Sequence, residues 1–208
     1  MTTDAIPAAN TVEIIKSGDS TLTLTGDGVN LENTMFTVLA GRLVAVQASM
    51  PVGDATLHAA GGEIVLGSKT ADATVAYTNE LISDGGTLTA GAPGASGVTV
   101  NLPNGMTLNS GALNLRTDNG NALNVSGSIT GAGSVDIGAG ASVTLAGGGP
   151  YAFGGVTVTG GTFTTDNALN FDKLDVLDGA FVQTGLAASG QRDLTIASSL
   201  TINSNLDM

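Results

Sequence analysis

The chain of 208 residues contains no cysteine and few aromatic side chains. Without cysteine there is no disulfide bond, no thiolate metal site and no thiol nucleophile. Aromatic residues make up only 3% of the sequence, with no tryptophan and two tyrosines, so large rings cannot fill most of a core. Hydrophobic residues still make up 42% of the chain, which is enough for one sizeable core. Val, Leu, Ile and Ala must therefore fill it, and this favours a narrow interior.

Basic residues are also scarce. Six Lys and Arg stand against eighteen Asp and Glu, which gives a formal net charge of -12. The sequence has no cluster of Lys and Arg that could bind a phosphate backbone, and its acidity opposes binding to an anionic membrane surface. No apolar run approaches the roughly 20 residues that span a bilayer, and residues 1–10 show no signal peptide. We therefore expect neither a nucleic-acid partner nor membrane insertion by this segment.

A short alternation of an aliphatic residue, threonine and a second aliphatic residue recurs along the chain, whereas helical periodicity is weak. It occurs at residues 22–24, 98–100, 143–145, 156–158, 194–196 and 200–202. This pattern places the aliphatic side chains on one face and the threonine on the other, as in a half-buried β-strand. Between these short strands stand Gly-Gly, Asn-Gly, Asp-Gly and Ser-Gly pairs, which form turns.

Equivalent strands recur at a nearly constant spacing of about 20 residues. Two series in the C-terminal half have this step: Leu113, Val135, Val156, Leu174 and Leu194, and Leu123, Val143, Phe163, Phe181 and Leu200. Interleaved series with one period are what a parallel β-helix requires, because each coil places a strand on the equivalent strand of the preceding coil. We therefore predict an all-β fold, a parallel β-helix (β-solenoid) of about ten coils and roughly 50 Å in length.

The N-terminal half is less regular. A third series with a similar step can continue the solenoid: Leu22, Leu43, Ile64 and Leu88. Residues 1–20 are interpreted as a candidate N-terminal cap. Residues 21–208 are interpreted as a single β-solenoid, with an irregular stretch near residues 66–86.

The stretch from Ser128 to Thr164 carries an ordered series of glycines, aliphatic residues and one tyrosine. Its first part contains Gly131, Gly133, Val135, Gly138, Gly140, Val143, Leu145 and Gly147, and its second part contains Tyr151, Gly154, Gly155, Val156, Thr157, Val158, Gly160, Gly161, Thr162 and Phe163. This order resembles the autotransporter-associated β-strand repeat, also called the passenger-associated transport repeat. Two residues depart from the pattern, namely the inserted Pro150 and Val156 where threonine is usual.

The resemblance covers less than a fifth of the chain, in one copy. It implies a right-handed parallel β-helix in a secreted bacterial autotransporter or adhesin, exposed at the cell surface. In that family the repeat is structural and is associated with export of the passenger, so the resemblance implies no catalytic residues.

His58 is the one histidine of the sequence and could in principle act as a general base or a metal ligand. No second histidine and no cysteine exists to complete a metal site. A serine nucleophile of the G-x-S-x-G type is absent too, because Ser96 lacks that spacing. We expect His58 to be an ordinary strand residue, and we assign no catalytic residue.

Acidic side chains cluster once, at Asp172, Asp175 and Asp178. With Leu174 inward, Asp175 points outward and the other two fall at strand ends, so the three are not expected to share a face. Residues 118–121 and 27–28 could bind a cation through Asp and Asn oxygens, but the glycine-aspartate nonapeptide repeat of Ca²⁺-binding secreted proteins is absent, so ordinary Asx-turns explain them better. We assign no metal site and no cofactor.

These observations together favour a non-catalytic structural or adhesive segment of a secreted, cell-surface passenger. Its ligand on a host or cell surface is not identified by the sequence. Two alternatives remain open: a filament or surface-layer subunit whose β-helix ends stack head to tail, and a polysaccharide lyase or hydrolase on the same fold. The enzyme alternative requires clustered carboxylates with basic partners on one outer face.

Overall fold

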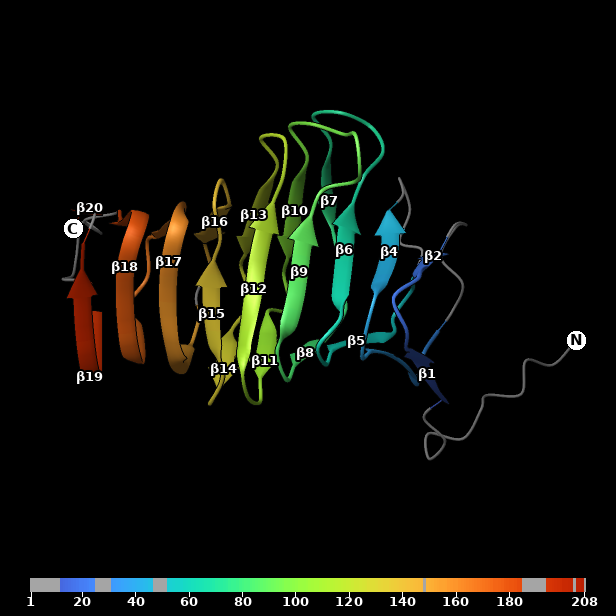
Figure 1. Cartoon of the computed structure of the whole chain (residues 1–208), viewed down its shortest axis with the longest axis horizontal. Coiled ribbons are helices and arrows are strands. Elements are labelled where there is room, and N and C mark those ends of the chain that lie inside the picture. Colours follow the sequence, from blue (N-terminus) through green and yellow to red (C-terminus); the bar gives the residue numbers. More distant parts are fainter. Residues whose placement is uncertain are drawn as a thin grey trace, which may run out of the picture.

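The computed structural model describes residues 12–24, 31–46, 52–147, 149–184, 194–203 and 205–207. The regular elements in these ranges are β-strands, and the paired strands run parallel to one another. They stack along one long axis, with the N-terminal strands at one end of a rod and the C-terminal strands at the other (Figure 1). The predicted all-β parallel β-solenoid is confirmed, whereas its right-handed sense stays a prediction.

Each regular coil contributes a strand segment to each of three sides, which we call A, B and C. Side A contains β1 (Val12–Lys16), β3 (Thr34–Val38), β5 (Thr56–Ala59), β8 (Leu81–Ser83), β11 (Met106–Leu108) and β14 (Ile129–Gly131). Side B contains β2 (Thr21–Leu24), β4 (Arg42–Val46), β6 (Glu63–Gly67), β9 (Gly86–Ala90), β12 (Ala112–Thr117) and β15 (Ser134–Ile137). Side C contains β7 (Thr74–Ala76), β10 (Thr99–Leu102), β13 (Ala122–Val125) and β16 (Ser142–Leu145).

The last coils are built from longer strands. Strands β17 (Tyr151–Thr165) and β18 (Leu169–Gln183) run through all three sides. Strand β19 (Leu194–Ile202) continues sides A and B, and β20 (Asn205–Asp207) continues side C.

The pairing register defines one line of inward residues along the whole of side B. It consists of Leu22, Leu43, Ile64, Leu88, Leu115, Ile137, Val158, Val176 and Ile202. These steps make about 8 turns of about 22 residues, rather than ten of 20. At about 4.8 Å per coil, the stacked part of the rod is roughly 38 Å long.

Both predicted C-terminal series are confirmed except for their last members. The first series is correct as far as Leu174, and the second as far as Phe181. Leu174 then lies opposite Leu200, not Leu194, and Phe181 lies opposite Leu206, not Leu200. The step from Phe181 to Leu206 is longer than 20 residues, so counting at a constant period selected a strand one side too early.

Aliphatic side chains fill most of the interior, as the composition predicts. Leu43, Ile64 and Leu115 have no exposed surface, and burying one such side chain contributes about 1.5–3 kcal/mol. Phe36 is the one buried phenylalanine near the N-terminal end of the described rod, whereas near the C-terminal end the rings of successive coils pack in pairs. The ring centroids of Phe153 and Phe171 lie 5.4 Å apart, and a second pair, from Phe163 to Phe181, repeats this contact at 5.7 Å.

Several glycines of the stretch 128–164 lie where neighbouring coils approach closely, whereas a Cβ atom on Gly138 or Gly140 would meet no close neighbour. A Cβ atom on Gly131 would lie 2.0 Å from the carbonyl oxygen of Leu108, and one on Gly147 would lie 1.7 Å from that of Ser126. The tyrosine of the same stretch, Tyr151, is buried with its hydroxyl 3.3 Å from the carbonyl oxygen of Val125. The order of residues that carries the family resemblance therefore has a packing cause in these coils.

Tyr77 plays a similar part nearer the N-terminal end. Its buried hydroxyl lies 2.5 Å from the carbonyl oxygen of Ala45 and 2.9 Å from that of Gly67, and it accepts a hydrogen bond from the Gly67 amide. Burial raises the pKa of Tyr77 to about 12, against a smaller lowering by the Gly67 hydrogen bond. The neutral phenol thus ties the ends of β4 and β6 together inside the rod.

Two segments singled out from the sequence, the candidate cap at residues 1–20 and the irregular stretch near residues 66–86, can be compared with the observed strands. Of the candidate cap, residues 1–11 lie outside the described residues, while β1 pairs with β3 in register and is part of side A. The stretch near residues 66–86 contains a loop at residues 68–73 and two short strands. Strand β7 belongs to side C, and strand β8 belongs to side A.

A charge placed inside the rod is expected to unfold it. Val143 has 1% of its surface exposed and lies between Leu123 and Phe163, so a Val143→Asp carboxylate would have no partner and would cost several kcal/mol. Thr144→Asp places the same charge on the outer face of the same strand. Urea denaturation should show a large loss of stability for the first variant and little for the second. Equal losses would contradict the inward assignment.

Candidate binding cleft

Three loops project from the corner between sides B and C: residues 68–73, 91–98 and 118–121 (Figure 1). Backbone and side-chain hydrogen bonds join them. The amide of Asp72 donates to the carbonyl oxygen of Ser96 at 2.9 Å, and the amide of Val98 donates to Oδ1 of Asn121 at 2.8 Å. Asn121 is buried, so the three loops form one connected ridge and do not project independently.

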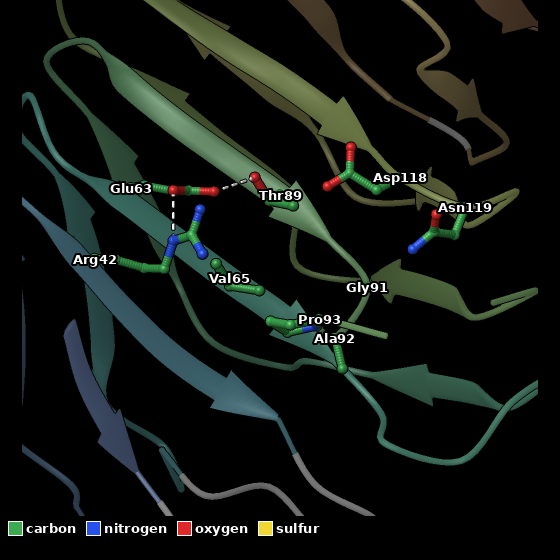
Figure 2. A pocket seen from close by; sticks show the side chains of 9 residues that line it. All are labelled: Arg42, Glu63, Val65, Thr89, Gly91, Ala92, Pro93, Asp118 and Asn119. Atoms are coloured by element: carbon green, nitrogen blue, oxygen red, sulfur yellow. Dashed lines mark hydrogen bonds and ion pairs between the residues drawn. The ribbon is translucent and has the colours of Figure 1, made fainter. Parts of the chain in front are cut away.

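A small open cleft lies on side B against this ridge (Figure 2). Its lining residues are Arg42, Glu63, Val65, Thr89, Gly91, Ala92, Pro93, Asp118 and Asn119, and its volume is about 100 Å³. Strands β4, β6 and β9 supply the first four residues, and two of the loops supply the rest. The cleft thus combines an apolar part at Val65, Ala92 and Pro93 with polar groups on both sides.

The polar side chains on the strands are held by one another. Arg42 Nε donates to Glu63 Oε2 at 2.7 Å, and the Thr89 hydroxyl donates to Glu63 Oε1, also at 2.7 Å. Glu63 is 20% exposed, whereas 43% of the Arg42 side chain is exposed. The terminal nitrogens of Arg42 point into the cleft, towards Val65 (Figure 2). They can donate to a ligand there, while Asp118 across the cleft can accept.

The size of the cleft limits what it can bind. Sites for drug-sized ligands and cofactors enclose about 300–1,000 Å³, several times the volume found here. A single sugar unit or one polar side chain of a partner could be accommodated, but no substrate would be enclosed and shielded from water.

Further along side B, two carboxylates occupy the same outward ladder. Asp136 lies opposite Thr157, which lies opposite Asp175, so the acids are two coils apart. The Lys173 ammonium contacts Asp175. The hydrogen bond from Lys173 lowers the pKa of Asp175, whereas burial raises the pKa of Asp136. This is the grouping of carboxylates with a basic partner that the enzyme alternative requires, but Asp175 is 9% exposed and engaged by Lys173.

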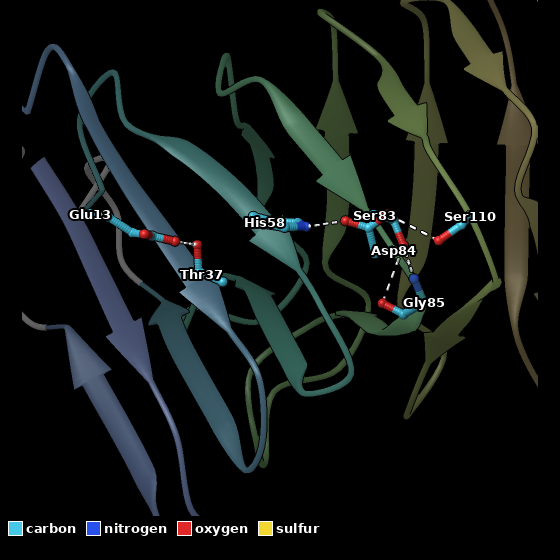
Figure 3. A network of polar contacts seen from close by, with 7 residues as sticks. All are labelled: Glu13, Thr37, His58, Ser83, Asp84, Gly85 and Ser110. Carbon is cyan, nitrogen blue, oxygen red and sulfur yellow. Dashed lines mark hydrogen bonds and ion pairs between the residues drawn. The ribbon is translucent and has the colours of Figure 1, made fainter. Parts of the chain in front are cut away.

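His58 belongs to a second polar group, at the corner between sides A and B (Figure 3). Its Nε2 lies 2.8 Å from Oδ2 of Asp84, and the hydroxyl of Ser110 donates to Oδ1 of the same carboxylate at 3.1 Å. These hydrogen bonds, that of His58 first, lower the pKa of Asp84. A serine nucleophile needs the imidazole beside its hydroxyl, but here the carboxylate stands between them. The group links three successive coils.

The other acidic residues singled out from the sequence are separated. Asp178 lies opposite Thr159 and accepts a hydrogen bond from Gly179, while Asp172 is exposed beside a shift of register. Residues 118–121 form a turn closed by a hydrogen bond from the amide of Asn121 to the carbonyl oxygen of Asp118. Residues 27–28 lie outside the described residues.

Two general features of the described ranges bear on function. No group of three or more histidine or acidic side chains within them is arranged to hold a metal ion. Within the same ranges there is also no helix of the length and apolarity that crossing a bilayer requires.

Sequence reasoning did not find the Arg42–Glu63 pair, although a signal for it exists. Each residue directly precedes a member of the inward series, Leu43 and Ile64, so both must occupy the same outward position in successive coils. Asn79 and Asn121 were also missed, because nothing in a local pattern marks a buried asparagine that hydrogen-bonds loop backbone.

When the chain is compared with known proteins, no protein-family model, no curated protein and no solved structure matches it. The fold itself defines the class: the protein is a β-solenoid with a three-sided coil.

Replacing His58 by alanine tests whether this residue is structural. Because the His58–Asp84 pair is partly exposed, His58→Ala should lower the free energy of unfolding by at most about 1 kcal/mol. The pKa of Asp84 is lowered in the fold, so its stabilising contribution is present above the ordinary aspartate pKa and lost as the pH falls through the folded value. Denaturation at pH 6 and pH 3 should therefore show the difference shrinking in acid. A difference that grows in acid would contradict this account.

Proposed function

We propose that the chain is a non-catalytic structural and adhesive segment of an autotransporter-like passenger, displayed at a bacterial cell surface. The observation that carries the proposal is the ordered stretch from Ser128 to Thr164. Several of its glycines, Gly131 and Gly147 among them, occupy close approaches between coils, and its tyrosine bridges two coils, so these features shared with the passenger repeat are ones on which coil stacking depends.

The outer surface supports adhesion better than catalysis. The loop ridge at residues 68–73, 91–98 and 118–121 and the cleft beside it offer a shallow binding surface on the flank of the rod. Two observations disfavour the lyase or hydrolase alternative. The cleft is too small to enclose a sugar chain, and Asp175 is covered by its contact with Lys173. A carboxylate in that state is poorly placed to exchange protons with a substrate.

Surface display tests the proposal. The chain is fused between a signal peptide and an outer-membrane translocator, and surface exposure is followed by protease digestion of intact cells. The proposal expects efficient display of the native chain and a several-fold loss when Gly131 and Gly147 are both replaced by valine, because the side chains would collide with neighbouring coils. Gly138→Ala, where φ is not left-handed and a Cβ atom would meet only the carbonyl oxygen of Leu115 at 3.9 Å, is the milder control. An equal amount of surface-exposed protein for the native chain and for the Gly131 and Gly147 double variant would contradict the proposal. Release of sugars from polysaccharide by the purified chain would also contradict it.

A head-to-tail filament is the second candidate. It is favoured by residues at both ends of the described rod that occupy inward positions in the pairing register but are nevertheless exposed. Ile14, on the first coil, is 37% exposed, although it lies opposite the buried Phe36. At the other end, Leu200 and Ile202 are 51% and 40% exposed although they pair with inward residues of β18. Among the described strands, β1 and β19 each have a partner on one edge only. Such edges with apolar residues favour pairing with further strands, which a second copy could supply as an open, heterologous contact.

The filament candidate predicts association that depends on salt and on the last coil. Net charge of -12 opposes assembly of like rods, so sedimentation should show larger species at high ionic strength than at low. Leu200→Lys should abolish them, whereas Leu177→Lys, also at an exposed leucine but followed by another coil, should not. A monomer at both salt concentrations would refute the filament and leave the first proposal standing.

A further inference from the structure

From β7 to β18, side C differs from side B in its lack of charge. Its outward positions on β7, β10, β13, β16 and the corresponding segments of β17 and β18 form two columns. One column contains Thr74, Thr99, Ala122, Ser142, Thr162 and Ala180, and the other contains Ala76, Asn101, Asn124, Thr144, Thr164 and Val182. None of the twelve is charged, aromatic or longer than asparagine, and none is buried. The outward positions of side B, in contrast, include Arg42, Glu63, Arg116, Asp136, Lys173 and Asp175.

The two columns are also regular in space. Parallel pairing holds neighbouring members of a column about 4.8 Å apart, and the columns are two residues, or about 6.7 Å, apart. Asn101 lies opposite Asn124, and Thr144 lies opposite Thr164. Because threonine and valine are branched at Cβ, their side chains are restricted at χ1, and the face is therefore a stiff array of hydroxyl, amide and methyl groups.

Soluble macromolecules are poor partners for this face. Six strands and four residues per strand give an area of roughly 380 Å², about half of the 800 Å² per partner that a stable protein interface needs. The face also lacks the Trp, Tyr, Arg and Met anchors of such interfaces. It has no aromatic ring on which a sugar could stack and no basic residue for a phosphate. A periodic solid is the remaining complement for a periodic face.

We propose that side C binds ice. In a tetrahedral water lattice with hydrogen bonds of about 2.75 Å, next-nearest oxygen atoms lie about 4.5 Å apart, within roughly a tenth of the coil spacing. Hydroxyl and amide groups in a column can therefore take the places of lattice waters, while the methyl groups between them impose no competing hydrogen bonds. Charged groups would hold their own hydration shells against the lattice, and the two columns have none from β7 to β18; the first charged residue on side C is Asp207 of β20, which pairs with Val182.

Freezing behaviour tests the proposal on the purified chain. Nanolitre osmometry should show a freezing point below the melting point and faceted crystals. Thr144→Lys, in the middle of side C, should abolish the gap between the two temperatures, because the ammonium brings its own hydration into the array. Thr157→Lys is the matched control: it places the same side chain outward on side B, between Asp136 and Asp175, and should keep the gap.

Circular dichroism establishes that each variant is folded, and Ser142→Lys on the same strand replaces Thr144→Lys if the latter unfolds. Absence of any gap with the native chain would overturn the proposal, and so would a gap that survives both side C variants or is lost equally in the side B control. Co-sedimentation of the chain with crystalline cellulose is a second experiment, which tests binding to a solid polysaccharide. Binding there without an effect on ice would assign side C to a polysaccharide surface and overturn the proposal as well. The result does not depend on the passenger assignment, because it is measured on the isolated chain.

Discussion

The in-register parallel pairing of one coil with the next is the constraint on which the rest of this structure depends. A strand in this rod satisfies its backbone groups only through the coils on either side of it. Since side chains alternate between two faces, a shift by one residue would turn a whole inward line outward. The unbroken inward series of side B, from Leu22 to Ile202, shows that the register is kept through coils of unequal length.

Unequal coils are tolerated because extra residues leave the rod at its corners. Two of the three longest steps of the side B series, from Ile64 to Leu88 and from Leu88 to Leu115, contain the loops at residues 68–73 and 91–98, which project without disturbing the pairing of β6, β9 and β12. Glycine, in turn, is required where corners of successive coils meet, as at Gly131 and Gly147. In the described residues, the same constraint thus produces a uniform interior, sides of regular register and an irregular ridge, and the ridge is where the candidate cleft forms.

The sequence predicted the solenoid because the alternation of aliphatic residues with threonine and the recurrence of strands are both local signals. It predicted the inward series as far as Leu174 and Phe181, and it failed at Leu194 and Leu200 because a constant period cannot anticipate a longer coil. The site was harder to predict. Arg42 and Glu63 are adjacent only through the register, and Asp118 reaches the cleft from a loop whose path no local pattern defines.

Distances between spin labels along one outward ladder test the stacking most directly. Thr21, Thr87, Thr157 and Thr201 belong to one such ladder on side B, and the lack of native cysteine makes any introduced cysteine unique. Pulsed electron resonance on cysteine pairs should give backbone separations of about 24 Å for Thr87 with Thr201, about 29 Å for Thr21 with Thr157 and about 38 Å for Thr21 with Thr201, before allowance for the label arms. Separations that do not increase with the number of intervening coils would contradict the solenoid.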